Sequence, residues 1–183
     1  MPQWLLKLLP ALGQFLLFLC LVAAVGLIMF FVGEKMGRDS LDWNRFPYKA
    51  MAWEMGGAVY LHIAIQHWKD RAPDMSKVVK STVPKKILSQ RNPEHLRQLI
   101  LETCSAERVH WILVFLSPIF LIFLHGAFGV AAMLIYILGN LPFIVIQRYN
   151  RPRLVQLMER QLRVSAERAR GAGGSLCNRP SSS

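Results

Sequence analysis

A short polar cluster stands directly before a long apolar stretch of the chain. Residues 102–111 read Glu-Thr-Cys-Ser-Ala-Glu-Arg-Val-His-Trp, and the stretch from there to Ile146 is mostly apolar. On a helix, Glu107 and His110 would be neighbours on one face. A carboxylate in that place can accept one ring N–H of the histidine, which leaves the other ring nitrogen to take a proton from a hydroxyl. This is the base half of an acyl transfer, so we predict that His110 and Glu107 are catalytic, with Glu102 lining a second side of the site.

A second polar cluster begins where the apolar stretch ends. Residues 147–153 read Gln-Arg-Tyr-Asn-Arg-Pro-Arg, at the start of a predicted helix. Guanidinium groups bind phosphate in a bidentate manner, and a helix N-terminus adds dipolar attraction. The cluster therefore predicts a site for a phosphate-bearing donor, such as a coenzyme A thioester, or for a lipid headgroup. The residues predicted to bind substrate are Arg148, Asn150, Arg151, Arg153, Tyr149, Gln147, Glu54, Trp111, Trp68 and Lys69.

Other interpretations of these clusters remain. Glutamate, histidine and tryptophan are ordinary at a membrane boundary, and arginines commonly flank spanning helices. One histidine and two glutamates resemble metal ligands, but an HExxH-type pair is missing, so we predict no metal and no cofactor. Cys104 would lie about 120° from His110 around a helix, which disfavours it as a nucleophile.

Two apolar runs must position these clusters. The first covers residues 15–32 and the second covers residues 111–146, where His125 is the one readily ionisable residue. A helix needs about 20 apolar residues to cross the hydrocarbon layer, so the second run fits two crossings with a turn near Gly126 or Gly129. Both polar clusters would then lie at the same face of the membrane.

The distribution of charge predicts the orientation. The net charge is +11, with nine Lys/Arg against five Asp/Glu in residues 67–110 and eight against two in residues 147–183. By the positive-inside rule, these basic regions and the site are cytoplasmic. Three crossings would place the N-terminus outside, whereas a fourth at 48–66 would place both termini inside; we favour four, although this segment could also re-enter or lie on the membrane. Such basicity also suits nucleic acid, but anionic headgroups are nearer partners, and we expect no nucleic-acid binding.

The predicted fold is all-α: a polytopic integral membrane protein of about four transmembrane helices with amphipathic cytoplasmic helices. One helical domain, residues 1–170, would hold helices at about 3–32, 48–66, 93–125, 127–147 and 152–170. Asn92-Pro93-Glu94 and Pro152 are typical of helix starts. The Gly- and Ser-rich residues 171–183 predict a disordered tail.

The residues of the two clusters resemble a known family. Glu102-Thr103, Ala106-Glu107 and His110-Trp111, followed by Asn140-Leu-Pro-Phe-Ile-Val-Ile-Gln147-Arg-Tyr-Asn-Arg-Pro-Arg-Leu154, resemble the glycosyl-4,4'-diaponeurosporenoate acyltransferases. The resemblance is strong over residues 92–158 and looser over 43–80, where Trp68-Lys69 matches. It implies a bacterial membrane enzyme of the staphyloxanthin type of carotenoid pathway. Such enzymes esterify a sugar hydroxyl of a glycosylated carotenoid with a fatty acyl chain.

We therefore expect an O-acyltransferase of the cell membrane, with acyl-CoA as donor and a glycosylated carotenoid or related glycolipid as acceptor. The sequence has no HxxxxD motif and no GxSxG elbow, which favours direct transfer assisted by His110 over a serine acyl-enzyme. Two other classes stay open. One is a non-catalytic lipid- or pigment-binding membrane subunit, and the other is a small lipid transporter, whose polar residues would lie near mid-bilayer.

Overall fold

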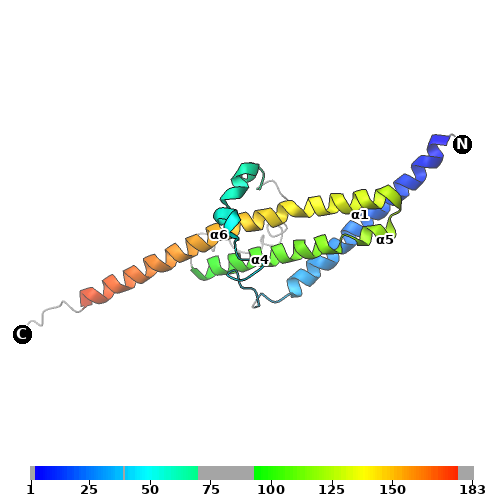
Figure 1. Cartoon of the computed structure of the whole chain (residues 1–183). Helices are drawn as coiled ribbons and strands as arrows, with labels where there is room; N and C mark the ends of the chain where they lie inside the picture. The colour runs from blue at the N-terminus through cyan, green and yellow to red at the C-terminus, as the bar shows by residue number, and fades with distance from the viewer. Residues whose placement is uncertain (1–2, 39, 70–92, 177–183) are drawn as a thin grey trace, which may run out of the picture.

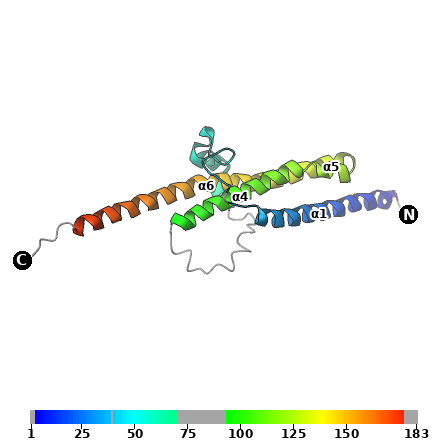
Figure 2. The same ribbon diagram turned by 90° about the horizontal axis from the view of Figure 1, so that it is seen from below.

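Three long helices form a bundle drawn out along one axis (Figure 1). The computed structural model describes residues 3–38, 40–69 and 93–176, and these contain helices and connections but no β-strand. The long elements are α1 (Gln3–Lys35), α4 (Pro93–Leu116), which is continued by the short α5 (Ile119–Phe123), and α6 (Gly126–Leu176). Helices α4 and α6 are antiparallel, and α1 packs against α4 (Figure 2).

The outer surface of the bundle is that of a membrane protein. Three helices are long and apolar enough to cross a bilayer: Leu9–Lys35, Pro93–Phe123 and Gly126–Arg168. Large apolar side chains cover their outer faces, with Phe115 and Ile122 each 75% exposed. Apolar surface on this scale is unfavourable in water and is expected where lipid is the solvent. The predicted all-α membrane fold is confirmed.

A tight turn joins α5 to α6. Helix α4 ends just before Pro118, because proline has no N–H to continue the helical hydrogen bonds. The chain then reverses at Gly126, whose φ of 62° lies in the left-handed region that glycine adopts without strain. Gly126 is one of the two positions at which the sequence predicted a turn.

Contacts at both ends of α1 fix its direction. Near the hairpin turn, Phe18 packs on Phe120 with ring centroids 5.3 Å apart, and the His125 amide donates to the Gln14 side chain at 3.2 Å. At the other end, Arg38 pairs with Glu102 at 3.1 Å. The start of α1 and the hairpin turn therefore lie at one end of the bundle, and the polar clusters lie at the other.

The segment predicted as a second spanning helix, 48–66, has a different structure. Residues Ala52–Ile63 form a 3₁₀ helix, η1, which is followed by the one-turn α2 (Ile65–Trp68). Met55, Gly56 and Gly57 have φ values of 49°, 64° and 89°, which an α-helix cannot accommodate. Residues 51–69, here named the arm, stand out from the side of α6 in both views (Figures 1 and 2). Within the described residues, three helices rather than four are long and apolar enough to span.

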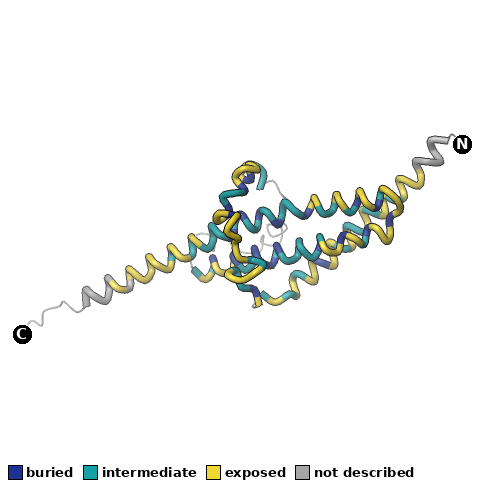
Figure 3. Tube along the Cα trace, viewed as in Figure 1, coloured by how far each residue is buried: buried dark blue, intermediate teal, exposed yellow. Residues whose placement is uncertain are grey.

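The boundary predicted between helices 127–147 and 152–170 is also wrong. Helix α6 is continuous from Gly126 to Leu176 with Pro152 inside it. Continuity places Arg148 and Arg151, three residues apart, on the face toward α4, where both bind one carboxylate. Beyond Pro152 the helix keeps its direction and is mostly exposed (Figure 3). Residues 171–176 of the predicted disordered tail are helical, and 177–183 lie outside the described residues.

Candidate active site

A buried cluster of four charges joins the two polar segments of the sequence. Glu54 and Glu107 are 1% and 0% exposed. Arg148 lies between them, with Nη1 2.7 Å from Glu107 and Nε 2.5 Å from Glu54. Arg151 pairs with the second oxygen of Glu107 at 2.5 Å. Two negative and two positive charges therefore balance one another within the packed interior.

The remaining donors of the two arginines also find acceptors. Arg148 donates to the Pro47 carbonyl at 3.0 Å, and Arg151 donates to the Tyr48 carbonyl at 2.7 Å. Arg151 further donates to the hydroxyl and carbonyl of Thr103, at 3.0 and 3.1 Å. Buried ion pairs are tolerated when every polar group is satisfied in this way. The cluster thereby holds α4, α6, the arm and the connection before the arm in one arrangement.

Glu54 is the point at which the arm joins this cluster. The Tyr60 hydroxyl and the Met51 amide both donate to its carboxylate, the latter at 2.6 Å. Burial alone would raise the pKa of Glu54, but the hydrogen bonds from Arg148, Tyr60 and Met51 outweigh burial and lower the pKa below its usual value. Burial and the bond to Glu54 raise the pKa of Tyr60, so it stays a donor. The arm is therefore docked through an ionised carboxylate.

His110 lies one helical turn further along α4 than Glu107, toward the hairpin turn. Its Nδ1 is 2.9 Å from Oδ1 of Asn140 on α6. The Asn140 amide nitrogen donates to the Tyr136 carbonyl at 2.8 Å, which directs the amide oxygen toward the ring. An oxygen acceptor at Nδ1 places the ring proton there and leaves the lone pair on Nε2. The half-buried ring also stacks on Phe143, with centroids 4.7 Å apart and planes 8° from parallel.

The prediction that Glu107 orients His110 is therefore wrong. The carboxylate of Glu107 accepts from Arg148, Arg151 and, at 3.3 Å, from the Trp111 indole. Two guanidinium groups attract a carboxylate more strongly than a neutral imidazole N–H does, so the histidine takes a different partner. Glu102 is likewise bound to Arg38 of the α1 connection rather than grouped with His110. Asn140 is the residue that orients the ring.

The arginines that the sequence predicted to bind a phosphate group have other partners in the structure. Arg148 and Arg151 form ion pairs with the carboxylates of Glu54 and Glu107. Arg153 folds back on Tyr149, donating to its carbonyl at 2.6 Å with the guanidinium 3.6 Å above its ring. The Lys69 ammonium lies 5.8 Å from the centre of the same ring. Trp68 also packs there, with its indole bound to the Ile63 carbonyl at 3.0 Å, whereas Gln147 and Asn150 are half-buried.

An open cavity of about 260 Å³ lies beside the buried cluster. Tyr48, Arg148, Arg151 and the exposed Lys49 line it. Four further residues of α6 line the cavity: Pro152, Val155, Gln156 and Glu159. Among the charged residues of the buried cluster, Glu54, Arg148 and Arg151 line this cavity.

Asn140, Phe143 and Tyr60 were missed from the sequence. Asn140 carries the one amide side chain between Trp111 and Ile146, and an amide in an apolar spanning segment needs a partner. That signal was available. Phe143 stands in the stretch that resembles the family, although no role was assigned to it, and no signal in the sequence marked Tyr60.

A metal centre finds no support among the described residues. They contain no group of three or more His, Cys, Asp and Glu side chains that could hold a metal ion. The expectation that the reaction needs neither metal nor cofactor stays a prediction.

The sequence of the region that contains the buried cluster, His110 and Asn140 matches a known protein family. The sequence model of the glycosyl-4,4'-diaponeurosporenoate acyltransferase family matches residues 44–160. The chain belongs to this family. It is 35% identical over 96 residues to the glycosyl-4,4'-diaponeurosporenoate acyltransferase of Staphylococcus aureus strain MRSA252, and 34% identical to that of strain N315. Each alignment covers 51% of this chain and 56% of the relative, so the chain spans about half the length of the curated relatives it matches. No solved structure is significantly similar to it.

Proposed function

We propose that this family member is a membrane O-acyltransferase, which moves a fatty acyl chain from an activated donor to a hydroxyl of a glycosylated carotenoid or related glycolipid. Family membership supports the reaction class and the acceptor. The observation that carries the chemistry is the His110–Asn140 pair, because it leaves Nε2 of a half-buried imidazole as a proton acceptor.

The proposed reaction is a direct transfer. Nε2 of His110 takes the proton of the acceptor hydroxyl while the hydroxyl oxygen attacks the thioester carbonyl carbon of the donor. The tetrahedral intermediate then expels the thiolate, which takes the proton back from the imidazolium. The products are the ester and the free thiol, and His110 returns to its starting state. Asn140 holds the Nδ1–H throughout, so it is a positioning residue.

The donor is proposed to be an acyl-CoA, with its polar group in the cavity beside Lys49. Arg148 and Arg151 are held by carboxylates, so they line the cavity without supplying a free charge. Lys49 would supply the charge for a phosphate group. The acyl chain and the carotenoid would enter sideways from the lipid, toward the level of His110 on α4.

The proposed orientation has the cluster at the cytoplasmic face of the cell membrane. Arg148, Arg151 and Arg153 lie at this end of the bundle, and the positive-inside rule assigns such an end to the cytoplasm. If the three helices that are long and apolar enough to span all cross the membrane, α1, which starts beside the hairpin turn, would have its N-terminal end facing outward.

The proposal is tested on the full chain in lipid nanodiscs. Radiolabelled long-chain acyl-CoA is added with glycosyl-4,4'-diaponeurosporenoate, and the lipid fraction is analysed for a labelled ester. A new ester that requires both the protein and the acceptor supports the proposal. A carotenoid that binds the protein but is never acylated would indicate a non-catalytic pigment-binding subunit instead.

A further inference from the structure

The outer surface of the arm is apolar although it lies outside the three spanning helices. Trp53, Met55 and Ile63 are 59%, 67% and 52% exposed, and Met51 and Leu61 are also exposed. Between Lys49 and Lys69, Glu54 is the one Asp, Glu, Lys or Arg in the sequence, and it is buried. The exposed surface of residues 50–68 therefore carries no Asp, Glu, Lys or Arg side chain, and Lys69 stands at the end of the arm.

The inner side of the arm fixes its level along the bundle. Tyr60 and Ile65 form a core cluster with Ile146 and Tyr149 of α6. Ile146 ends the apolar stretch of α6 and Arg148 is its first charged residue. The arm is therefore packed where hydrocarbon gives way to headgroups.

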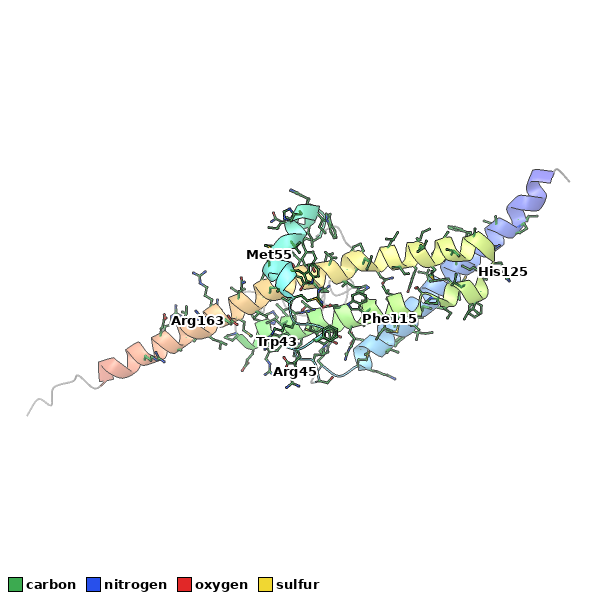
Figure 4. All side chains as sticks on the ribbon, in the orientation of Figure 1. Trp43, Arg45, Met55, Phe115, His125 and Arg163 are labelled. Atoms are coloured by element: carbon green, nitrogen blue, oxygen red, sulfur yellow. The ribbon has the colours of Figure 1, made fainter. Side chains whose placement is uncertain are left out.

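The arm also points in a direction that suits a position at the membrane boundary. In two views at right angles, the arm stands out sideways from α6 rather than running along the bundle (Figures 1 and 2). Figure 4 shows Met55 on the arm, Phe115 on the apolar part of the hairpin and Arg163 on the projecting part of α6. A segment that leaves a spanning helix sideways at the boundary lies in the plane of the membrane.

We propose that the arm is an interfacial membrane anchor, whose outer side chains Trp53, Met55 and Ile63 insert into the headgroup–acyl boundary of the same leaflet that holds the charge cluster. The partner is the lipid itself. Tryptophan favours this zone, and methionine and isoleucine favour the acyl chains beneath it. The Glu54–Arg148 pair then joins a lipid-embedded surface to the buried cluster. This inference concerns membrane placement and stands independently of the proposed acyl transfer.

Spin labels at single cysteines test the depth of the arm in nanodiscs. The native cysteines Cys20, Cys104 and Cys177 are replaced by alanine, and a label is placed at Met55 or, separately, at Ile63. Reference labels at Phe115 and Glu159 report the lipid and water environments. Collision with oxygen, which concentrates in lipid, is compared with collision with a water-soluble nickel chelate.

The proposal expects both arm labels to collide more with oxygen than with the chelate, as at Phe115. Labels that behave like the one at Glu159 would overturn it, because the arm would then be in water. Labels shielded from both reagents would also overturn it, since protein rather than lipid would then cover the arm. Quenching of Trp53 by brominated lipids, measured as wild type minus Trp53→Phe, checks the result with the native cysteines in place.

Discussion

At the scale of single residues, His110 meets Asn140 because both lie 15 positions from His125, beside the turn of an antiparallel helix pair. Glu107 of the same helix is paired with Arg148 and Arg151, which lie further along α6. Two neighbouring positions on α4 thus receive different partners. The Glu107 carboxylate binds two guanidinium groups, and the His110 imidazole binds the neutral amide of Asn140. The first pairing stabilises the site, and the second sets the tautomer of the proposed base.

Asn140→Leu should lower kcat for acyl transfer by about 100-fold with little change in KM, because an unheld imidazole samples unproductive orientations. Leucine keeps a similar volume, so packing against α4 should survive. The measurement is steady-state kinetics in nanodiscs, with the thermal unfolding of each variant as the control. An unchanged kcat in a folded variant would remove Asn140 from the mechanism.

Glu107→Gln should destabilise the protein by about 3–5 kcal/mol, because it leaves Arg148 and Arg151 with one carboxylate between them inside the packed interior. The matched control is Glu159→Gln, which changes an exposed glutamate on α6. Unfolding in mixed micelles measures both variants. Equal stability of the two would show that the buried cluster contributes nothing to the fold.

At the scale of elements, the arm depends on one close approach and one ion pair. A Cβ at Gly57 would lie 3.0 Å from the Arg153 guanidinium and 3.2 Å from the Tyr149 carbonyl, whereas a Cβ at Gly56 would meet nothing within 4 Å. Both glycines have positive φ. Glu54 supplies the ion pair with Arg148. These two features offer independent ways to release the arm.

Gly57→Ala should loosen the arm more than Gly56→Ala does. Both variants carry the strain of alanine in the left-handed region, about 1–2 kcal/mol, but only Gly57→Ala also crowds the Arg153 guanidinium and the Tyr149 carbonyl of α6. Hydrogen–deuterium exchange over residues 51–64 measures the difference. Identical exchange in the two variants would show that the close approach does not hold the arm.

Lowering the pH should also release the arm. The pKa of Glu54 is lower in the folded protein than its ordinary value of 4.5, so its contribution to stability is complete above pH 4.5 and is lost as the pH falls through the folded pKa. The same exchange measurement between pH 7 and pH 3 should show an acid transition that is absent in Glu54→Gln. An identical transition in that variant would assign it to another group.

At the scale of the whole molecule, the long apolar runs predicted the all-α membrane fold, the hairpin and the meeting of both polar clusters at one end. The prediction failed where tertiary contacts override local signals. Pro152 is typical of a helix start, yet α6 continues through it and presents both Arg148 and Arg151 to Glu107. The hydropathy of 48–66 suits a spanning helix, but its glycines and the pairing of Glu54 make it an arm.

The sequence predicted that the two polar segments meet, but not which residues pair between them. Periodicity places Glu107 and His110 on one face of α4 but does not say which partner each takes from α6. That choice depends on the register of the hairpin, which the turn at Gly126 sets. With the turn known, the segment around Asn140 is expected to lie opposite the segment around His110, but the individual pairs do not follow from counting.

The most direct test of the central claim is the initial rate of acyl transfer by His110→Ala beside His125→Ala in nanodiscs. His125 is exposed at the hairpin turn, at the opposite end from the charge cluster, so it is a matched histidine control. We predict a loss of about 100- to 10,000-fold for His110→Ala, with wild-type rates for His125→Ala and unchanged folding of both. A folded His110→Ala variant that transfers acyl chains at the wild-type rate would contradict the assignment of His110 as the base.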